Sequence, residues 1–180
     1  MPDRYLIGCG CPRSGTTALA RLLDAQSGVA VSHEDNPVVP WQPDTGDVER
    51  SVGWLERGGH FLGSAARPVM GDVSFSWLPA LEACQRHFGD QLRVVVLRRD
   101  KEEWLASVTE AIGDAVLHDD TTFATQFPTY DEPLEDAWSR YYDTYYANVD
   151  EDLIVPTEAL GGDEGQQDIL ERTNLSPTTD

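Results

Sequence analysis

The chain has 180 residues, of which 40% are hydrophobic and 25% are charged, a composition typical of one packed domain and not of a disordered or fibrous chain. Its 32 acidic and 13 basic residues give a formal net charge of −19, which disfavours binding to nucleic acid and to anionic lipid. No apolar run approaches the roughly 18 residues of a membrane span, and the start of the chain is polar at Asp3 and Arg4. We therefore expect a cytoplasmic protein without a signal peptide or membrane contact.

Cysteine, histidine and lysine are scarce. Three cysteines are too few for a disulfide framework, and the four histidines show no zinc-ligand spacing, so we expect no metal. Lys101 is the single lysine, and the acidic residues are spread along the chain among Trp, Leu and Val. This composition resembles that of halophilic archaeal proteins, whose acidic surface keeps them soluble at high salt. The alternative is an acidic disordered tail.

Strand and helix patterns alternate along the chain, which predicts an α/β fold with a mostly parallel sheet of about five strands flanked by helices. The expected strands are Arg4–Cys9, Val29–Val31, Val69–Ser74, Leu92–Leu97 and Leu153–Val155. The expected helices are Thr16–Ala25, Val48–Arg57, Trp77–Phe88, Glu102–Val116, one that Pro133 opens, and a weak one at Gln166–Arg172. Residues 1–160 form the expected domain, and 161–180 an acidic C-terminal segment with a frayed end.

Residues 10–17, with the sequence GCPRSGTT, form a glycine-bracketed loop between a hydrophobic strand and an amphipathic helix. Backbone N–H groups in such a loop converge on an anion, and the helix adds the positive end of its dipole. The spacing follows the Walker A motif, but Thr16 stands where the phosphate-binding lysine would be, and Arg13 lies inside the loop. We therefore predict a single-domain P-loop nucleotide-binding fold, in which the loop contributes Arg13, Ser14, Gly15, Thr16 and Thr17 to the ligand.

The run PRSGTT at residues 12–17, placed after a first strand, resembles the sulfate-donor loop of the sulfotransferases that use 3′-phosphoadenosine 5′-phosphosulfate (PAPS). The likeness is greatest to the tyrosylprotein-type and bacterial branches. It implies that the loop binds the 5′-phosphosulfate end of PAPS. It also implies that Arg13 stabilises charge on the bridging oxygen as the sulfuryl group leaves.

A second segment fits the same family. Arg99 follows the most buried strand, and Ser107 lies eight residues further on in the next helix. This arrangement resembles that of sulfotransferases, in which an arginine and a serine at this spacing hold the 3′-phosphate of the nucleotide. The resemblance implies that Arg99 and Ser107 do so here. Taken alone, Arg99 is also compatible with a surface arginine paired with Asp100 or Glu103.

Transfer of a sulfuryl group to a hydroxyl or amine requires a base for the acceptor proton. The run His33-Glu34-Asp35 ends the second strand, and residues at the carboxyl edge of a parallel sheet point into the ligand crevice. Glu34 lies 21 residues after Arg13, an offset similar to that of the catalytic glutamate in tyrosylprotein-type sulfotransferases. Glu34 is therefore the expected base and His33 the second candidate, while a merely solvated acidic loop is the alternative.

Two further segments leave alternatives open. Residues 71–76 resemble a G-[DE]-K-[ST]-P segment of several family members, in which the lysine can assist the leaving phosphate or sulfate. Val73 replaces that lysine here, so Arg13 would have to supply the cationic assistance alone or with Arg98. Asp72 is either a second base or substrate contact, or a helix cap. The stripe of Trp138, Tyr141, Tyr142 and Tyr145 is more often core than an acceptor pocket.

The resemblance thus implies an enzyme that moves a sulfuryl group from PAPS to an acceptor hydroxyl or amine by in-line displacement, without a metal. The acceptor, whether a small molecule, a peptide or a glycan, does not follow from the sequence, and neither does the oligomeric state. Two other functions stay open. One is a divergent P-loop kinase or NTPase, and the other is a nucleotide-binding protein without transfer activity.

Overall fold

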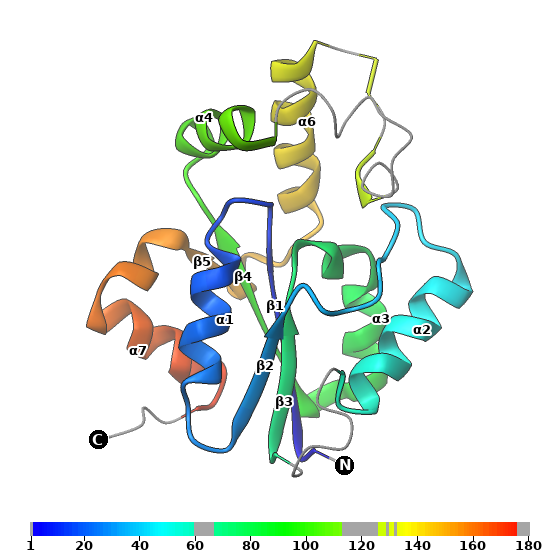
Figure 1. The fold of residues 1–180 in the computed structure, drawn as a ribbon, viewed down its shortest axis with the longest axis vertical. Coiled ribbons are helices and arrows are strands. Elements are labelled where there is room, and N and C mark those ends of the chain that lie inside the picture. The colour runs from blue at the N-terminus through cyan, green and yellow to red at the C-terminus, as the bar shows by residue number, and fades with distance from the viewer. Residues whose placement is uncertain (1, 60–66, 113–125, 129, 132, 176–180) are drawn as a thin grey trace.

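A computed structural model describes residues 2–59, 67–112, 126–128, 130–131 and 133–175. Within these ranges the strands form one parallel sheet of five strands in the order β2-β3-β1-β4-β5 (Figure 1). The strands are β1 (Arg4–Gly10), β2 (Val29–His33), β3 (Val69–Val73), β4 (Leu92–Arg98) and β5 (Ile154–Pro156). The predicted fold class, a single-domain α/β P-loop fold with a sheet of about five strands, is confirmed.

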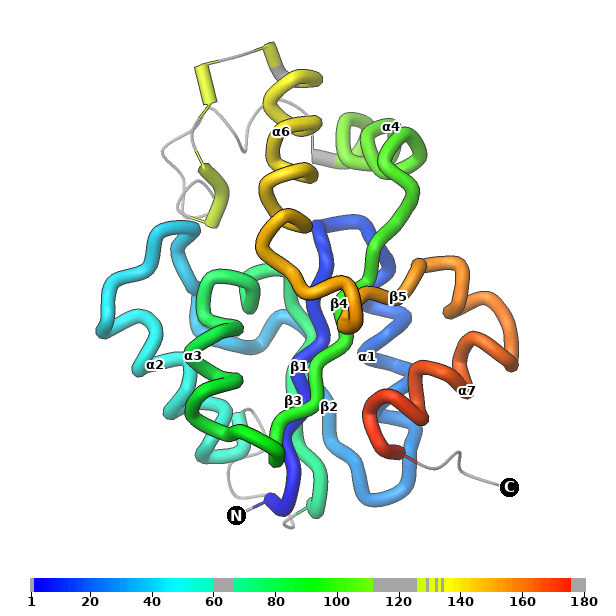
Figure 2. Tube along the Cα trace, turned by 180° about the vertical axis from the view of Figure 1, so that it is seen from behind, coloured from blue at the N-terminus to red at the C-terminus, as the bar shows by residue number. Residues whose placement is uncertain are grey.

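Helices cover both faces of the sheet and also lie beyond the ends of its strands. They are α1 (Thr16–Asp24), α2 (Thr45–Glu56), α3 (Leu78–Phe88), α4 (Lys101–Ile112), α6 (Leu134–Ala147) and α7 (Asp163–Arg172). Helices α1 and α7 lie on one face and α2 and α3 on the other, as the two opposite views agree (Figures 1 and 2). Helices α4 and α6 stand beyond the carboxyl ends of the strands. Both faces of the sheet are therefore buried, as is usual for parallel sheets.

Side chains of β1 alternate between the two cores, because successive residues of a strand point to opposite faces. Tyr5, Ile7 and Cys9 pack in the core that includes α3 and α6, whereas Leu6 packs in the core that includes α1 and α7. All three cysteines of the chain are free and fully buried, at Cys9, Cys11 and Cys84. The central strand is thus enclosed, with every residue after Arg4 buried.

Some boundaries differ from the prediction for local reasons. Helix α2 begins before Val48, because the Asp44 carboxylate accepts the Asp47 N–H at 2.8 Å and the Asp47 carboxylate accepts the Asp44 N–H at 3.2 Å, a reciprocal capping box. The predicted extension of α4 to Val116 lies outside the described residues. In α7, Ile169 and Leu170 are buried in the core of the sheet, so the domain continues past residue 160. The predicted frayed end, at 176–180, also lies outside the described residues.

Because the strands are parallel, their carboxyl ends meet at one edge of the sheet. The loop after β1, the residues after β2, the turn after β3 and the residues after β4 therefore converge there. In the part of the chain that is described, no helix has both the length and the apolar character needed to cross a membrane.

Candidate functional site

The predicted phosphate-binding loop, residues 10–17, which we call the phosphate loop, turns sharply between β1 and α1. Arg13 and Gly15 have left-handed backbone conformations, with φ of 69° and 92°. At Gly15 a Cβ would lie 3.2 Å from both Thr157 and Leu160, so both the conformation and the packing favour glycine. Among the described residues, the N–H groups of Gly15, Thr16 and Thr17 have no backbone acceptor. They are the free donors of a helix N-terminus, which attract an anion.

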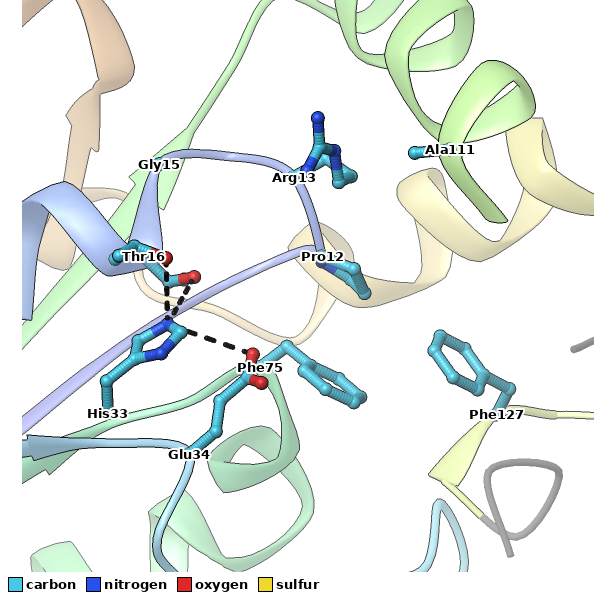
Figure 3. Close-up of a pocket in the computed structure, with 10 residues that line it drawn as sticks. Pro12, Arg13, Gly15, Thr16, His33, Glu34, Phe75, Ala111 and Phe127 are labelled. Carbon is cyan, nitrogen blue, oxygen red and sulfur yellow. Dashed lines mark hydrogen bonds and ion pairs between the residues drawn. The ribbon is translucent and has the colours of Figure 1, made fainter. Parts of the chain in front are cut away.

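A cavity of about 690 Å³ lies beside this loop at the carboxyl edge of the sheet (Figure 3). Its polar wall comes from the loop and from the end of β2: Arg13, Gly15, Thr16, Thr17, His33 and Glu34. Its apolar wall is made by Pro12, Phe75, Ala111 and Phe127. The structure thus gathers four of the five predicted loop contacts and both predicted base candidates around one cavity.

His33 connects the loop to the base candidate. Its Nε2 atom lies 3.2 Å from Thr16 Oγ1, 3.4 Å from Thr17 Oγ1 and 3.8 Å from Glu34 Oε1. The side chains of His33 and Glu34 are 29% and 45% exposed, so both are open to a ligand in the cavity. A base and two hydroxyl donors therefore lie within reach of one another on the polar wall (Figure 3).

Two of the three predicted catalytic residues, Arg13 and Glu34, have a strained backbone conformation. Three residues other than glycine have positive φ in the described ranges: Arg13 at 69°, Glu34 at 57° and Asn174 at 57°. Asparagine tolerates this conformation, but longer side chains rarely adopt it. The Glu34 N–H donates to the Val73 carbonyl at 3.0 Å, a bond that helps to hold the turn after β2. Such strain clusters at functional sites.

Arg13 is the cation of the cavity. Its Nε donates to Ser107 Oγ at 3.5 Å, and it has no carboxylate partner among the described residues. Arg98 and Arg99, at the end of β4, are paired with Glu151 and Glu103, whereas no ion pair of Arg13 is found within the described residues. In so acidic a chain, this leaves a local positive site for an anion.

Arg99 is not part of the cavity wall. Its Nε and Nη2 atoms both lie 3.4 Å from Glu103 Oε2, and Ser107, its predicted partner, contacts Arg13 instead. Arg98 is paired with Glu151 at 3.0 Å. The structure therefore brings Ser107 to the loop but leaves Arg99 in the surface ion pair that was the alternative reading. An exposed pair of this kind contributes at most about 1 kcal/mol, so a phosphate can compete for Arg99.

The predicted ligand contact of Ser14 needs correction. Ser14 is fully buried, and its hydroxyl donates to the Cys11 carbonyl at 2.6 Å. It shapes the loop and does not face the cavity. Val73, where the resemblance to sulfotransferases would place a lysine, is fully buried in the core beside α1. A cation there would not point into the cavity.

Asp72 has neither of the roles predicted for it. It is fully buried, with Oδ1 accepting the Ser32 hydroxyl at 2.7 Å and the Asp35 N–H at 3.2 Å, and Oδ2 accepting Trp77 Nε1 at 2.8 Å. Ser74, not Asp72, caps the short helix that follows. Burial raises the pKa of Asp72, and these donors oppose that shift. Asp72 thus ties β2 and β3 together beneath Glu34.

The aromatic stripe of α6 is core, as predicted: Trp138, Tyr141 and Tyr145 are fully buried and Tyr142 is 8% exposed. Sequence reasoning missed that the helix also reaches the phosphate loop, where the Tyr145 hydroxyl accepts the Gly10 N–H at 3.1 Å. A signal was present, because a buried tyrosine hydroxyl usually requires a partner, unlike a phenylalanine.

In comparisons with known proteins, no protein-family model and no curated protein matches the chain. Among the residues described, no group of three or more His, Cys, Asp or Glu side chains could hold a metal ion.

Proposed function

We propose that this chain is a sulfotransferase that moves a sulfuryl group from PAPS to an acceptor hydroxyl or amine. The observation that carries the proposal is the composition of one cavity wall. Within the described residues, Arg13 has no ion-pair partner and the N–H groups at the start of α1 have no backbone acceptor, and both border the same space as the carboxylate of Glu34. Anion donors and a base side by side are what group transfer from an anionic donor requires.

In this scheme the loop N–H groups and the Thr16 and Thr17 hydroxyls bind the phosphosulfate end of PAPS. The acceptor oxygen or nitrogen attacks sulfur from the side opposite the bridging oxygen, and a new bond to sulfur forms as the bond between sulfur and the bridging oxygen breaks. The electron pair of the broken bond stays on the 5′-phosphate of the departing 3′-phosphoadenosine 5′-phosphate (PAP). Arg13 stabilises the charge that develops there.

Glu34 accepts the proton that the acceptor loses in this step. Its carboxylate lines the same cavity as the apolar residues Phe75 and Phe127, with Phe75 beside it (Figure 3), so the cavity offers an acceptor both a base and an apolar surface. His33 is the second candidate for this base. Its contacts with Thr16 and Thr17 also suit it to hold those two hydroxyls toward the donor.

The 3′-phosphate is assigned to Arg99 and Ser107, as the family resemblance implies. Arg99 has to exchange Glu103 for the phosphate, and the contact of Ser107 with Arg13 would join the two ends of the donor site. A bidentate arginine fork suits a phosphate better than the single carboxylate oxygen it contacts here.

The first test is binding of PAP, measured by calorimetry in molar KCl to screen the net charge of the chain. AMP, which lacks the 3′-phosphate, and magnesium ATP are the comparators. Tight binding of PAP that AMP does not match supports the proposal, and transfer from PAPS to a panel of acceptors follows. A preference for magnesium ATP favours the kinase or NTPase alternative. PAP binding with no transfer to any acceptor class favours a nucleotide-binding protein without activity.

A further inference from the structure

Four side chains hold the backbone of the phosphate loop from outside the cavity. Three of them bond to residues 10–12: Tyr145 accepts the Gly10 N–H at 3.1 Å, Tyr146 accepts the Cys11 N–H at 3.3 Å, and Trp104 Nε1 donates to the Pro12 carbonyl at 2.6 Å. The fourth is Thr157, whose hydroxyl donates to the Ser14 carbonyl at 2.8 Å. We call this set the loop brace: Trp104, Tyr145, Tyr146 and Thr157.

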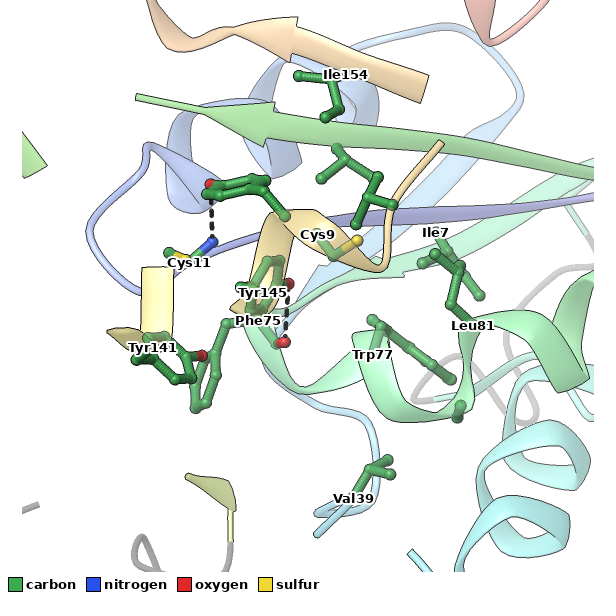
Figure 4. Close-up of a cluster of buried hydrophobic side chains, with 14 of the residues drawn as sticks. Ile7, Cys9, Cys11, Val39, Phe75, Trp77, Leu81, Tyr141, Tyr145 and Ile154 are labelled. Atoms are coloured by element: carbon green, nitrogen blue, oxygen red, sulfur yellow. Dashed lines mark hydrogen bonds between the residues drawn. The ribbon is translucent and has the colours of Figure 1, made fainter. Parts of the chain in front are cut away.

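The two tyrosine hydroxyls also connect the loop to neighbouring parts of the sheet. The Tyr145 hydroxyl donates to the Phe75 carbonyl at 3.0 Å (Figure 4), and the Tyr146 hydroxyl donates to the Leu97 carbonyl at 2.7 Å. Each hydroxyl therefore uses its one donor and one acceptor position. Burial raises the pKa of both hydroxyls far above the ordinary value of 10.0, so both remain protonated at any working pH.

The brace surrounds the strained position of Arg13. The carbonyl groups of Pro12 and Ser14, on either side of it, are held by Trp104 and Thr157. A left-handed conformation at a residue other than glycine persists only where its surroundings over-determine it. The brace supplies that determination, since the carbonyl groups of the residues on both sides of Arg13 have fixed partners.

The brace also decides which N–H groups remain for an anion. Those of Gly10 and Cys11 are used by the two tyrosines, whereas those of Gly15, Thr16 and Thr17 have no backbone acceptor among the described residues. Neither tyrosine lines the cavity. Any effect of these hydroxyls on ligand binding must therefore pass through the loop backbone.

We propose that Tyr145 and Tyr146 are positioning residues of the donor site. Their hydroxyls orient the loop so that the N–H groups after Arg13 face the anion, and donor affinity then depends on hydroxyls that the donor does not touch. The proposal rests on the proposed function in that it takes PAP as the anion bound by the loop.

The same helix offers a matched control. Tyr141 is fully buried beside Tyr145, with ring centroids 5.8 Å apart, but its hydroxyl has no hydrogen-bond partner among the described residues. Tyr141→Phe therefore removes a hydroxyl of the same size from the same core without removing a bond to the loop. It separates an effect on positioning from a general effect on packing.

The experiment compares Tyr146→Phe and Tyr145→Phe with Tyr141→Phe in molar KCl. Calorimetry gives the Kd for PAP, and backbone amide exchange by NMR reports on Gly10 and Cys11. We expect PAP to bind roughly tenfold more weakly to each of the first two variants, because a buried N–H loses its acceptor and the loop shifts to recover one. The amide that loses its acceptor, which is Gly10 in Tyr145→Phe and Cys11 in Tyr146→Phe, should exchange faster by a similar factor. Tyr141→Phe should stay within about twofold of the parent chain in both measurements.

A folded Tyr146→Phe with unchanged Kd and unchanged amide exchange would overturn the proposal. If the tyrosine variants do not fold, Thr157→Val tests the brace from a partly buried position outside the aromatic core, and it should weaken PAP binding in the same direction. If the parent chain binds no PAP, the proposed function fails. Inorganic sulfate then serves as the anion, and amide exchange at Gly10 and Cys11 still decides whether the tyrosines hold the loop.

Discussion

Arg13 and Glu34 border one cavity, and each holds its backbone in the left-handed region, at φ values of 69° and 57°. Neither residue is glycine or asparagine, so each conformation costs about 1 to 2 kcal/mol relative to the right-handed region. The two turns come directly after β1 and β2, at the edge where a parallel sheet presents its ligands. The fold thus accepts strain at the two positions that the proposed chemistry needs most.

Replacing Glu34 with glycine should raise stability while it removes activity. Glycine adopts positive φ without the steric cost, so the free energy of unfolding of Glu34→Gly should rise by up to about 1 kcal/mol, after allowance for the greater freedom of glycine in the unfolded chain. Urea denaturation in molar KCl measures the change. The control is Glu34→Ala, which removes the carboxylate but keeps the strain at this position. A variant Glu34→Gly no more stable than Glu34→Ala would contradict the strain argument.

Arg13→Ala should abolish turnover and only partly weaken nucleotide binding. Arginine at this position stabilises charge that develops as the sulfuryl group leaves, whereas the loop N–H groups still bind the ground-state anion. We expect kcat to fall by at least roughly a hundredfold. Arg50→Ala, at an exposed arginine paired with Asp47 on α2, is the matched control and should leave kcat unchanged. Unchanged turnover in Arg13→Ala would remove Arg13 from the mechanism.

Glu34→Gln should separate catalysis from binding. The amide cannot accept the acceptor proton, so kcat should fall by about two to four orders of magnitude, the usual contribution of a general base. The Kd for PAP should stay within about twofold, because a base removes its proton from the acceptor and not from the nucleotide. If His33→Asn instead shows the large loss and Glu34→Gln does not, then His33 is the base.

The ion pair between Arg99 and Glu103 should oppose nucleotide binding. Arg99→Ala removes a charge-assisted bond to the 3′-phosphate and should weaken PAP binding by about 1.5 to 3 kcal/mol. Glu103→Gln frees Arg99 from its partner and should tighten PAP binding by about two- to fivefold. Calorimetry measures both, with AMP as the ligand that neither variant should affect. Equal Kd values for PAP in both variants and the parent chain would place the 3′-phosphate elsewhere.

Asp72 should give a distinctive dependence of stability on pH. Burial raises its pKa in the folded chain above the ordinary value of 3.8, so the folded state holds this proton more tightly than the unfolded state does. Its contribution to stability is therefore fully present below pH 3.8 and declines as the pH rises from there through the raised value. Asp72→Asn cannot titrate. The unfolding free energy of the parent chain minus that of Asp72→Asn should fall with pH across this window, and a constant or rising difference would contradict the burial argument.

The alternation of strands and helices was predictable because it depends on local periodicity. Leu92–Leu97, a near-continuous apolar run, forms all of β4 except its last residue, and the stripe on α6 is core. The loop context was also predictable, since glycines at 10 and 15 lie between a strand and a helix. Hydrophobic pattern and turn chemistry act over a few residues, which is the range that one sequence displays.

The parts that escaped prediction depend on contacts between distant residues. Tyr146 and Cys11 are 135 positions apart, and Thr157 and Ser14 are 143 apart, so no local pattern links them. Asp72 looks like a site carboxylate in the sequence, and only the positions of Ser32 and Trp77 show that it is a buried tie. The choice of Arg99 between a phosphate and Glu103 likewise depends on which partner is present.

The burial of the three cysteines gives the protein internal probes of its own opening. Burial raises the pKa of Cys9 and Cys84 to about 12, and that of Cys11 in the same direction, so the reactive thiolate is scarce as well as shielded while the chain is folded. An alkylating reagent should therefore modify each site at a rate set by the opening of its own surroundings. Cys84 in α3 reports on the body of the domain, whereas Cys11 reports on the loop itself. A difference between their labelling rates would show the loop opening separately from the rest of the domain.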